Sequence, residues 1–228
     1  MFFGVLPEFL QGLGPQALLQ AFPVLLVGTV ITIKITLLAV GIGTLIGLIF
    51  GIMRLSQNRL VYGISTVYVE FFRGTPLLVQ IFLINFGVLP LFMKGVDPFV
   101  AAVIACSINS GAYVAEIVRG GIQSIDRGQT EAAYSLGMKP AQNMIYVILP
   151  QAFKIMVPPM INEFIAMMKD TSLVSVIAVE ELTRKGQLQV AVTYQSFWVW
   201  GGVAIIYLIM TLVISQLGKM AERRMAVE

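Results

Sequence analysis

The chain has 228 residues, of which 57% are hydrophobic and 12% are charged, whereas an average soluble domain is about 25% charged. Its 15 basic and 12 acidic residues give a net charge of +3 and are scattered along the chain, which argues against a nucleic-acid-binding surface. Because a membrane-spanning helix takes about 20 apolar residues, the composition excludes an ordinary soluble protein and predicts an all-α membrane protein with several crossings.

Five apolar runs predict five transmembrane helices. They cover approximately residues 24–53, 74–92, 98–118, 145–168 and 197–217. The segments between them carry most of the charge, and no internal repeat or low-complexity linker interrupts them, so we expect residues 1–228 to form a single domain. Residues 1–15 lack the basic region and the cleavage site of a signal peptide, and we expect them to remain on the mature protein.

The distribution of basic residues predicts the orientation, because Lys and Arg favour cytoplasmic loops. If the first helix ends inside, nine basic residues lie on the inner side and four on the outer side. The inner ones are Arg54, Arg59, Arg119, Arg127, Lys139, Lys154, Lys219, Arg223 and Arg224, and the outer ones are Lys94, Lys169, Arg184 and Lys185. This asymmetry predicts an N-terminus outside the membrane and a C-terminus in the cytosol.

In the first apolar run, small and hydroxylated residues recur on one helical face. They are Thr29, Thr32, Thr36, Gly43, Gly47 and Gly51. Such a face lets two helix backbones approach closely, and we expect a contact within the subunit, with a dimer contact or a moving pathway helix as alternatives. Lys34 points to nearly the opposite side, where we expect it to extend toward the outer interface. A substrate contact is the alternative for this residue.

A charged pair lies just before the second run, and a proline lies near its start. Glu70 and Arg73 stand three residues apart on one helical face, and we expect them to pair at the inner boundary. Pro76 removes a backbone hydrogen bond from the helix that contains it. The resulting kink can bend the helix around a pathway, or it can be part of the scaffold.

Polar residues in the middle of the third and fourth runs are candidate substrate-pathway residues, because a polar group in hydrocarbon needs a partner or water. They are Asn109, Ser110 and Tyr113 in the third run, and Asn162 and Glu163 in the fourth. We expect Pro158 and Pro159 to break the fourth helix and free carbonyls that can coordinate a ligand. Glu163 can accept the α-ammonium of an amino acid. A structural hydrogen bond or ion pair between helices is the alternative.

The charged segment 119–144 lies between the third and fourth runs and predicts two short helices joined by a tight turn. Asp126 can cap the first of these helices, and Gly137 can end it in the left-handed conformation. Pro140 suits the first turn of the second helix. The segment is therefore an ordered loop with a defined shape.

Within this loop, Ala132 and Ala133 leave a bare surface beside Glu131, which can lie in a groove of a cytosolic partner. The loop resembles that of the transmembrane subunits of ATP-binding-cassette (ABC) importers, in which Glu-Ala-Ala is followed at fixed spacing by Gly, Ile and Leu-Pro. The corresponding residues here are Glu131-Ala132-Ala133, Gly137, Val147 and Leu149-Pro150. Only the valine in the isoleucine position departs from the pattern.

Further stretches resemble the permeases of polar amino acid ABC importers, a histidine, glutamine and arginine permease-like family. They are Glu70 to Gln80, Asn109 to Ile117, Lys169 to Ile177 and Glu222 to Arg224. The resemblance implies a type I importer permease fold with five transmembrane helices per subunit, in the lipid of the bacterial cytoplasmic (inner) membrane. It also implies that Glu131, Ala132, Ala133 and Gly137 belong to a coupling helix that docks on an ATPase dimer.

The same resemblance implies the partners and the mode of action. An extracytoplasmic binding protein would deliver a polar amino acid, and the permease would pair with a second copy of itself, as a homodimer, or with a paralogous permease. Transport would occur by alternating access, without covalent chemistry in this chain. ATP and Mg would be bound by the partner ATPase, in agreement with the lack of a Gly-x-x-x-x-Gly-Lys-Ser/Thr loop here, and we expect no cofactor in this chain.

The residue types also limit the other functions. With no histidine and a single cysteine, Cys106, the sequence offers no His/Cys metal site, histidine-based catalytic triad or disulfide framework. An intramembrane hydrolase is therefore a weaker alternative than a secondary transporter or channel that uses Glu163 and Lys34. A purely structural anchor agrees with the composition, but it would not need the spacing of the Glu131-Ala132-Ala133 loop. The substrate stays open among glutamine, glutamate, arginine, lysine, histidine and cystine.

Overall fold

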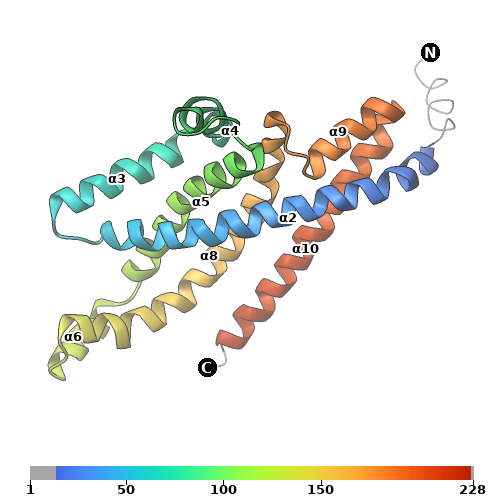
Figure 1. The fold of residues 1–228 in the computed structure, drawn as a ribbon. Coiled ribbons are helices and arrows are strands. Elements are labelled where there is room, and N and C mark those ends of the chain that lie inside the picture. Colours follow the sequence, from blue (N-terminus) through green and yellow to red (C-terminus); the bar gives the residue numbers. More distant parts are fainter. Residues whose placement is uncertain (1–13, 227–228) are drawn as a thin grey trace, which may run out of the picture.

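The computed structural model describes residues 14–226, which form helices joined by short turns (Figure 1). The long helices are α2 (Gly14–Met53), α5 (Pro98–Gln123), α8 (Leu149–Asp170) and α10 (Ser196–Ala226). The shorter α-helices are α3 (Arg59–Gly74), α4 (Leu77–Phe82), α6 (Arg127–Ser135), α7 (Pro140–Asn143) and α9 (Leu182–Thr193). Segments of π or 3₁₀ geometry are η1 (Leu83–Val88), η2 (Leu89–Leu91), η3 (Met144–Ile148) and η4 (Thr171–Ile177). The prediction for residues 1–15 falls largely on residues 1–13, outside the described part.

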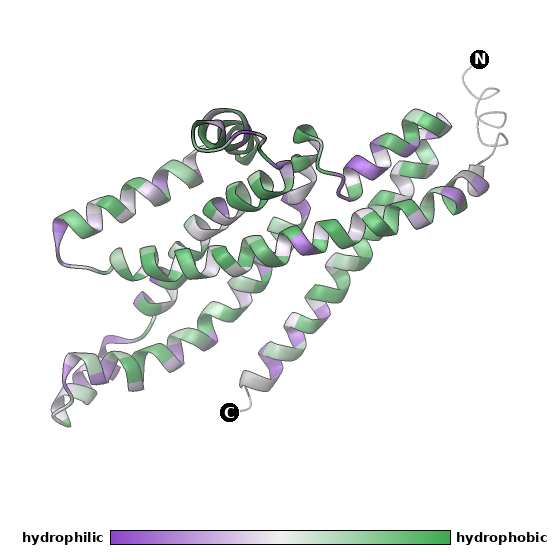
Figure 2. Ribbon diagram, viewed as in Figure 1, coloured by the Kyte–Doolittle hydropathy of each residue, from purple (hydrophilic) through white to green (hydrophobic). Residues whose placement is uncertain are grey.

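The described residues contain four helices long and apolar enough to cross a membrane, or five if one bent pair forms a single crossing. The bent pair is α3 with the segment Leu77–Leu91, and its two parts meet at 106°. Hydrophilic residues gather at α6, along α9 and in the last turns of α10, whereas α2 is largely apolar (Figure 2). The five crossings expected from the sequence thus correspond to these four helices and the bent pair.

The second crossing differs from the sequence prediction. Residues 54–73 were expected to be a charged segment between helices, but most of them form α3, and the apolar run that follows is only the second half of the crossing. The extended backbone of Thr75 (φ −117°, ψ 145°) separates the two halves, because a residue before proline avoids helical geometry. Pro76 therefore turns the chain sharply instead of kinking a continuous helix.

Two buried amides hold this bend. The side-chain nitrogen of Gln80 donates hydrogen bonds to the carbonyls of Phe72 at 2.9 Å and Thr75 at 3.0 Å, which are carbonyls at the broken end of α3. The Asn109 amide on α5 donates in turn to the side-chain oxygen of Gln80 at 3.0 Å. Since unpaired carbonyls in an apolar environment are costly, these bonds allow the helix to break inside the protein.

Helices α2 and α5 form the largest helix–helix interface of the described part, and they run in the same direction. The contacting pairs are Gly43 with Ser110, Gly47 with Val114 and Gly51 with Val118. A Cβ atom on Gly47 would lie 2.5 Å from the Val114 side chain, so only glycine fits there. The predicted small-residue contact within the subunit is confirmed, and we call it the glycine seam.

The other helices keep their predicted positions with different ends. Helix α2 begins at Gly14, α5 continues to Gln123, and α10 reaches Ala226. The prediction that Pro158 and Pro159 break the fourth helix is wrong, because α8 continues through both residues. Prolines are tolerated in membrane helices because neighbouring groups and small local adjustments satisfy the backbone groups that they free.

A buried carboxylate joins the start of α9 to α2 and α10. Glu181 is fully buried and accepts hydrogen bonds from the backbone of Thr183 at 2.8 Å and of Arg184 at 2.7 Å. The Tyr207 hydroxyl donates to it at 3.1 Å, and the Thr32 hydroxyl lies 3.5 Å away. The chain between α8 and α9 is therefore anchored firmly at its far end.

Candidate functional site

A hollow with two open lobes lies beside α5, on the side away from the glycine seam. The first lobe, here the Glu163 lobe, measures about 490 Å³ and is bordered by α3, α5 and α8. The second, here the Asp170 lobe, measures about 420 Å³ and is bordered by the α3–α4 bend, α5 and the end of α8. Arg73 and Tyr113 line both lobes, so the two form one continuous central hollow.

Glu163 is the unpaired anion of the first lobe. Its carboxylate accepts a hydrogen bond from the Ser110 hydroxyl at 2.8 Å, and it makes no ion pair with any described side chain. Asn162 precedes it in α8, is exposed and lines the same lobe. A carboxylate at membrane depth needs water or a positively charged partner, so the lobe can bind a cationic group.

Arg73 supplies the opposite charge, although the sequence predicted another role for it. Its guanidinium carbon lies 5.4 Å from the centre of the Tyr113 ring, a cation–π contact. One guanidinium nitrogen lies 3.7 Å from a Glu116 oxygen, too far for a hydrogen bond. The predicted pair of Arg73 with Glu70 is wrong, because Glu70 instead faces Arg54 at 3.6 Å. Glu70 and Arg73 thus each face a residue outside α3.

Glu116 forms the charged end of the Glu163 lobe. It accepts a hydrogen bond from Arg54 at 2.7 Å and pairs with Arg119 at 2.8 Å. These two arginines use both of its oxygens, so Glu116 is satisfied within the protein. Its place at the edge of the apolar run gave no signal of a pathway residue. Arg119 follows it by three residues on α5, whereas Arg54 reaches it only through the packing of α2 against α5.

Asn109 and Asp170, which both line the Asp170 lobe, have different roles. Asn109 was predicted as a pathway residue and lines the Asp170 lobe, but it is buried and its amide holds the α3–α4 bend. Asp170 was not predicted, because it stands beside Lys169 in a segment interpreted as a loop. In the structure it ends α8, lines the lobe and makes no ion pair with the described side chains.

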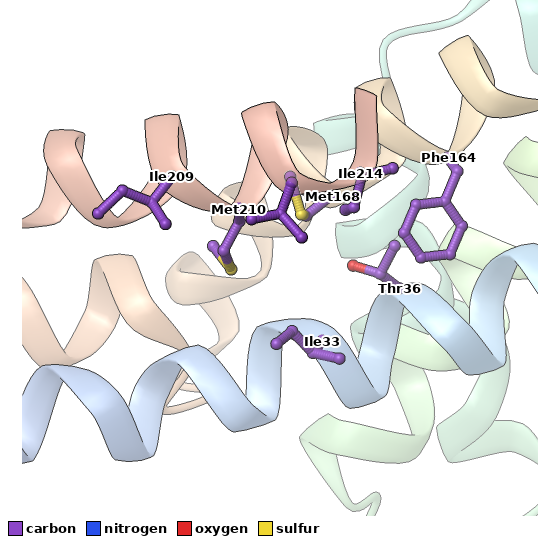
Figure 3. Close-up of a pocket in the computed structure, with 8 residues that line it drawn as sticks. Ile33, Thr36, Phe164, Met168, Ile209, Met210 and Ile214 are labelled. Carbon is purple, nitrogen blue, oxygen red and sulfur yellow. The ribbon is translucent and has the colours of Figure 1, made fainter. Parts of the chain in front are cut away.

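An apolar pocket of about 270 Å³ lies between α2, α8 and α10 (Figure 3). Its lining includes Ile33, Phe164, Met168 and Met210. Phe164 follows Glu163 directly in α8, so adjacent residues of one helix line a polar hollow and an apolar pocket. The apolar pocket offers no charged side chain for a polar substrate, and the central hollow remains the candidate site.

The loop between α5 and α8 has the predicted local structure. The Asp126 carboxylate caps α6 by accepting from the backbone of Gly128 at 2.7 Å. Gly137 follows α6 with φ of 78°, in the left-handed region, and Pro140 is the first residue of α7. These three turn signals were readable because each acts through its own backbone or the next few residues.

One expectation about the surface of this loop needs correction. Glu131 and Ala132 are exposed, but Ala133 is only 4% exposed because α6 packs against η3. The exposed apolar surface comes instead from Leu136, which is 83% exposed at the end of α6, and from Tyr134. The surface that can meet a partner is thus a mixture of acidic, small and larger apolar side chains.

Known proteins resemble this chain over nearly its whole length. Residues 43–227 match the family "Binding-protein-dependent transport system inner membrane component". The glutamine transport system permease protein GlnP of Escherichia coli (strain K12) is 42% identical over 93% of this chain and 97% of its own. The L-cystine transport system permease protein TcyB of Bacillus subtilis (strain 168) is 42% identical over 99% and 97%.

A solved structure is also similar. It is described as "Crystal structure of an amino acid ABC transporter with histidines", is 46% identical, and superimposes with a TM-score of 0.86 over 90% of this chain and 96% of the other. The predicted all-α permease fold of type I ABC importers is thereby confirmed, as is the inner-membrane location. Relatives of this kind are permease proteins and not enzymes. The chain belongs to the family of binding-protein-dependent transport system inner membrane components.

Proposed function

We propose that this permease carries a polar amino acid across the inner membrane by alternating access, driven by a separate ATPase. The observation that supports the proposal best is the unpaired Glu163 carboxylate in a hollow that also contains the Arg73 guanidinium. A free amino acid carries an ammonium and a carboxylate close together. Glu163 would bind the ammonium and Arg73 the carboxylate, and Asn162 and Tyr113 would complete the wall of the lobe.

The charge of the central hollow favours some amino acids over others. Glu116 is already paired with two arginines, so Glu163 and Asp170 are left as free carboxylates against the single guanidinium of Arg73. A neutral or cationic side chain fits this balance, whereas an acidic side chain would add repulsion in a region of low dielectric. We infer that glutamine, cystine, histidine, lysine or arginine is transported in preference to glutamate. The names of the relatives given above are compatible with this order.

The loop between α5 and α8 is the proposed joint with the ATPase. Glu131 and Ala132 on α6, with Leu136 at its end, would contact a groove of the ATPase. Ala133 and Gly137 would act indirectly, Ala133 by packing α6 on η3 and Gly137 by turning the chain. ATP and Mg would stay with an ATPase dimer, and closure of that dimer would move the permease helices.

The remaining features of the assembly belong to the same proposal. The α6 loop and the C-terminus would face the cytosol and the N-terminus the outside, as the distribution of basic residues predicts. Two copies would form a twofold homodimer, or one copy would pair with a paralogous permease. An extracytoplasmic binding protein would deliver the amino acid to the outer face.

Co-expression tests this proposal directly. The chain would be produced with a candidate ATPase and binding protein from the same source, purified through a tag on the permease, and assayed for ATP hydrolysis with each polar amino acid. We expect the ATPase to co-purify and one neutral or basic amino acid, with the binding protein, to stimulate it. Ion-gradient-driven uptake by the permease alone would instead support a secondary transporter. The copy number of permease in the complex separates a homodimer from a heterodimer.

A substitution at Gly137 tests the joint. Gly137→Asp places a charge and a side chain at a left-handed position, and we expect uptake to fall at least about tenfold while ATP hydrolysis becomes insensitive to substrate. Gly137→Asn is the matched control, because asparagine tolerates this backbone region and adds no charge. Normal substrate-stimulated hydrolysis and uptake in the aspartate variant would contradict the coupling role of this turn.

A further inference from the structure

A second hollow with charged residues in its lining lies near the start of α5, far from the α6 loop (Figure 1). It measures about 340 Å³ and is formed where three segments meet. Lys34 comes from α2, Asp97 precedes α5, and Ala178 and Glu180 belong to the link between η4 and α9. We call it the outer hollow, since the proposed orientation places it on the extracytoplasmic side.

The charges of the outer hollow are only partly satisfied within the protein. Neither Lys34 nor Asp97 makes an ion pair with the described side chains. One Asp97 oxygen caps α5 by accepting from the backbone of Phe99 at 2.8 Å, which leaves the other oxygen free. Glu180 pairs with Lys185, and this hydrogen bond lowers the pKa of Glu180, so it stays charged. A concave surface with one free cation and one free carboxylate oxygen suits a complementary charged protein surface.

The chain connects this hollow directly to the candidate substrate site. Asp170 and Leu173 line the Asp170 lobe, and a few residues later Ala178 and Glu180 line the outer hollow. Between them runs η4, a 3₁₀ helix of 7 residues, whereas such helices seldom exceed about 4 residues. A displacement of the outer hollow therefore has a short and continuous route to the central hollow.

Two features prevent this segment from absorbing such a displacement. Ala178 ends η4 with φ of 65°, a left-handed conformation that is unfavourable for a residue with a Cβ. Three residues later, the buried Glu181 carboxylate holds the chain through the start of α9 and Tyr207. The segment between η4 and α9 is thus strained at Ala178 and held in place at Glu181. A displacement at Ala178 therefore moves η4, toward the central hollow, rather than α9.

We propose that the outer hollow is the docking surface for the extracytoplasmic binding protein, and that η4 transmits docking to the central hollow. The family itself depends on a binding protein, and a protein with an acidic group opposite Lys34 and a basic or donor group opposite Asp97 matches the free charges. This inference rests on the proposed importer function. It goes further by assigning the contact to particular residues and by naming the segment that carries its effect.

The first test reverses one charge of the outer hollow. In the complex with the ATPase, ATP hydrolysis is titrated with the binding protein from the same source, loaded with its amino acid, and expressed relative to each variant's own basal rate. For Lys34→Glu we expect the half-saturating concentration of binding protein to rise about three- to tenfold at low salt, and the difference from the unaltered protein to shrink at high salt. Lys94→Glu is the matched control, because this exposed lysine lies three residues before Asp97 but does not line the hollow.

A cross-linking measurement supports the test independently of activity. The chain contains one cysteine, Cys106, which is buried, so a cysteine at position 34 or 94 can be labelled selectively with a maleimide photo-cross-linker. We expect Lys34→Cys to cross-link the binding protein at least about threefold more efficiently than Lys94→Cys. Equal cross-linking, together with equal titrations of the two charge variants, would overturn the assignment.

The role of η4 has its own readout. Ala178→Gly removes the strain and loosens the joint, because glycine adopts positive φ freely. We expect the half-saturating concentration of binding protein to stay the same while the maximal stimulation falls about twofold or more. An unchanged maximum would overturn transmission through η4. If the binding protein stimulates no hydrolysis in the unaltered complex, the proposed importer function fails, which is a different outcome from equal behaviour of the position 34 and 94 variants.

Discussion

The two sides of α5 are built for opposite purposes. Against α2 it presents the glycine seam, where backbones touch and a single added carbon would collide. Toward α3 and α8 it presents Tyr113 and Glu116, which line the hollow bordered by these helices. Dense packing holds a helix in one place, whereas a polar hollow needs walls that can separate. The comparison teaches that one helix can serve as the fixed wall of a pathway because its other side is immobilised.

The same contrast locates the movement that transport requires. The seam relies on close backbone contact over several turns, so α2 and α5 would move together as one rigid unit. Helices α5 and α8 pack directly through Val118 and Met156 at one end, whereas beside the hollow they are joined by the hydrogen bond from Ser110 to Glu163. A substrate that binds Glu163 can replace that link, so binding and rearrangement act on the same group.

Breaking the seam should give the largest effect. Gly47→Leu would force a side chain into the space occupied by Val114, and we expect the free energy of unfolding to fall by about 3 kcal/mol or more. Gly41→Leu is the control on the same helix, because no atom lies within 4 Å of a Cβ there. Thermal unfolding in detergent and the yield of monodisperse protein measure the difference. Equal stability of both variants would show that the seam is not the rigid side.

Removing the support of the bend should be the next largest effect. Gln80→Leu would remove the Gln80 amide from the Thr75 carbonyl and would leave the Phe72 carbonyl and the Asn109 amide with only their hydrogen bond to each other at 3.3 Å. Lost partners of buried groups cost about 1–3 kcal/mol. Thermal unfolding is again the measurement. Gln57→Leu, on the exposed turn between α2 and α3, should change stability little, and a similar loss there would show that the effect is not specific to the bend.

On the hollow side of α5, a change of charge should affect transport more than stability. Glu163→Gln keeps a hydrogen-bond acceptor for Ser110 but loses the charge, and we expect the uptake rate at low substrate to fall about tenfold or more. Ser110→Ala keeps the charge and loses only the hydrogen bond, so its loss should be smaller. Uptake in vesicles, normalised to assembled complex, measures both. Normal uptake kinetics in the glutamine variant would remove Glu163 from the substrate site.

The smallest effect is expected at the wall shared by the two lobes. Tyr113→Leu loses the aromatic face beneath Arg73, a contact worth about 0.5–1 kcal/mol when partly exposed, so the apparent substrate affinity should fall about two- to fivefold. Tyr113→Phe keeps the ring and should stay close to the unaltered protein. The uptake KM of each variant provides the comparison, and a larger loss in the phenylalanine variant would indicate a role for the hydroxyl group instead.

Local rules explain which parts of the molecule were readable from the sequence. The glycine seam follows from the spacing of Gly43, Gly47 and Gly51 on one helix, and the α6 loop follows from Asp126 and Gly137, whose effects extend over a few residues. Glu163 was identified because a carboxylate within an apolar run can be recognised from the sequence without any knowledge of its neighbours in space. Each of these signals is complete within one segment of chain.

The features that could not be predicted depend on contacts between segments. Glu70 and Arg73 satisfy the helical spacing rule, yet the packing of α3 on α2 and α5 offers each a different partner. Asn109 is a polar residue in an apolar run, as expected for a substrate ligand. Its amide instead donates a hydrogen bond to the side chain of Gln80, which lies far away in sequence. Ala133 is buried for a similar reason, since its neighbour η3 comes from a later part of the chain. Whether a polar residue of this helical bundle supports the fold or lines the pathway can be decided only once its neighbours in space are known.

Because α2 and α5 are parallel, the interface between them can form only late in synthesis. Two neighbouring helices that run the same way require the chain to cross back between them, and the bent pair of α3 and α4 makes that return. A nascent chain that has emerged only as far as residue 92 therefore contains the glycines of α2 but not the surface that covers them. Until α5 follows, those glycines face lipid or the insertion machinery, so biogenesis must protect the first helix through the insertion of the second crossing.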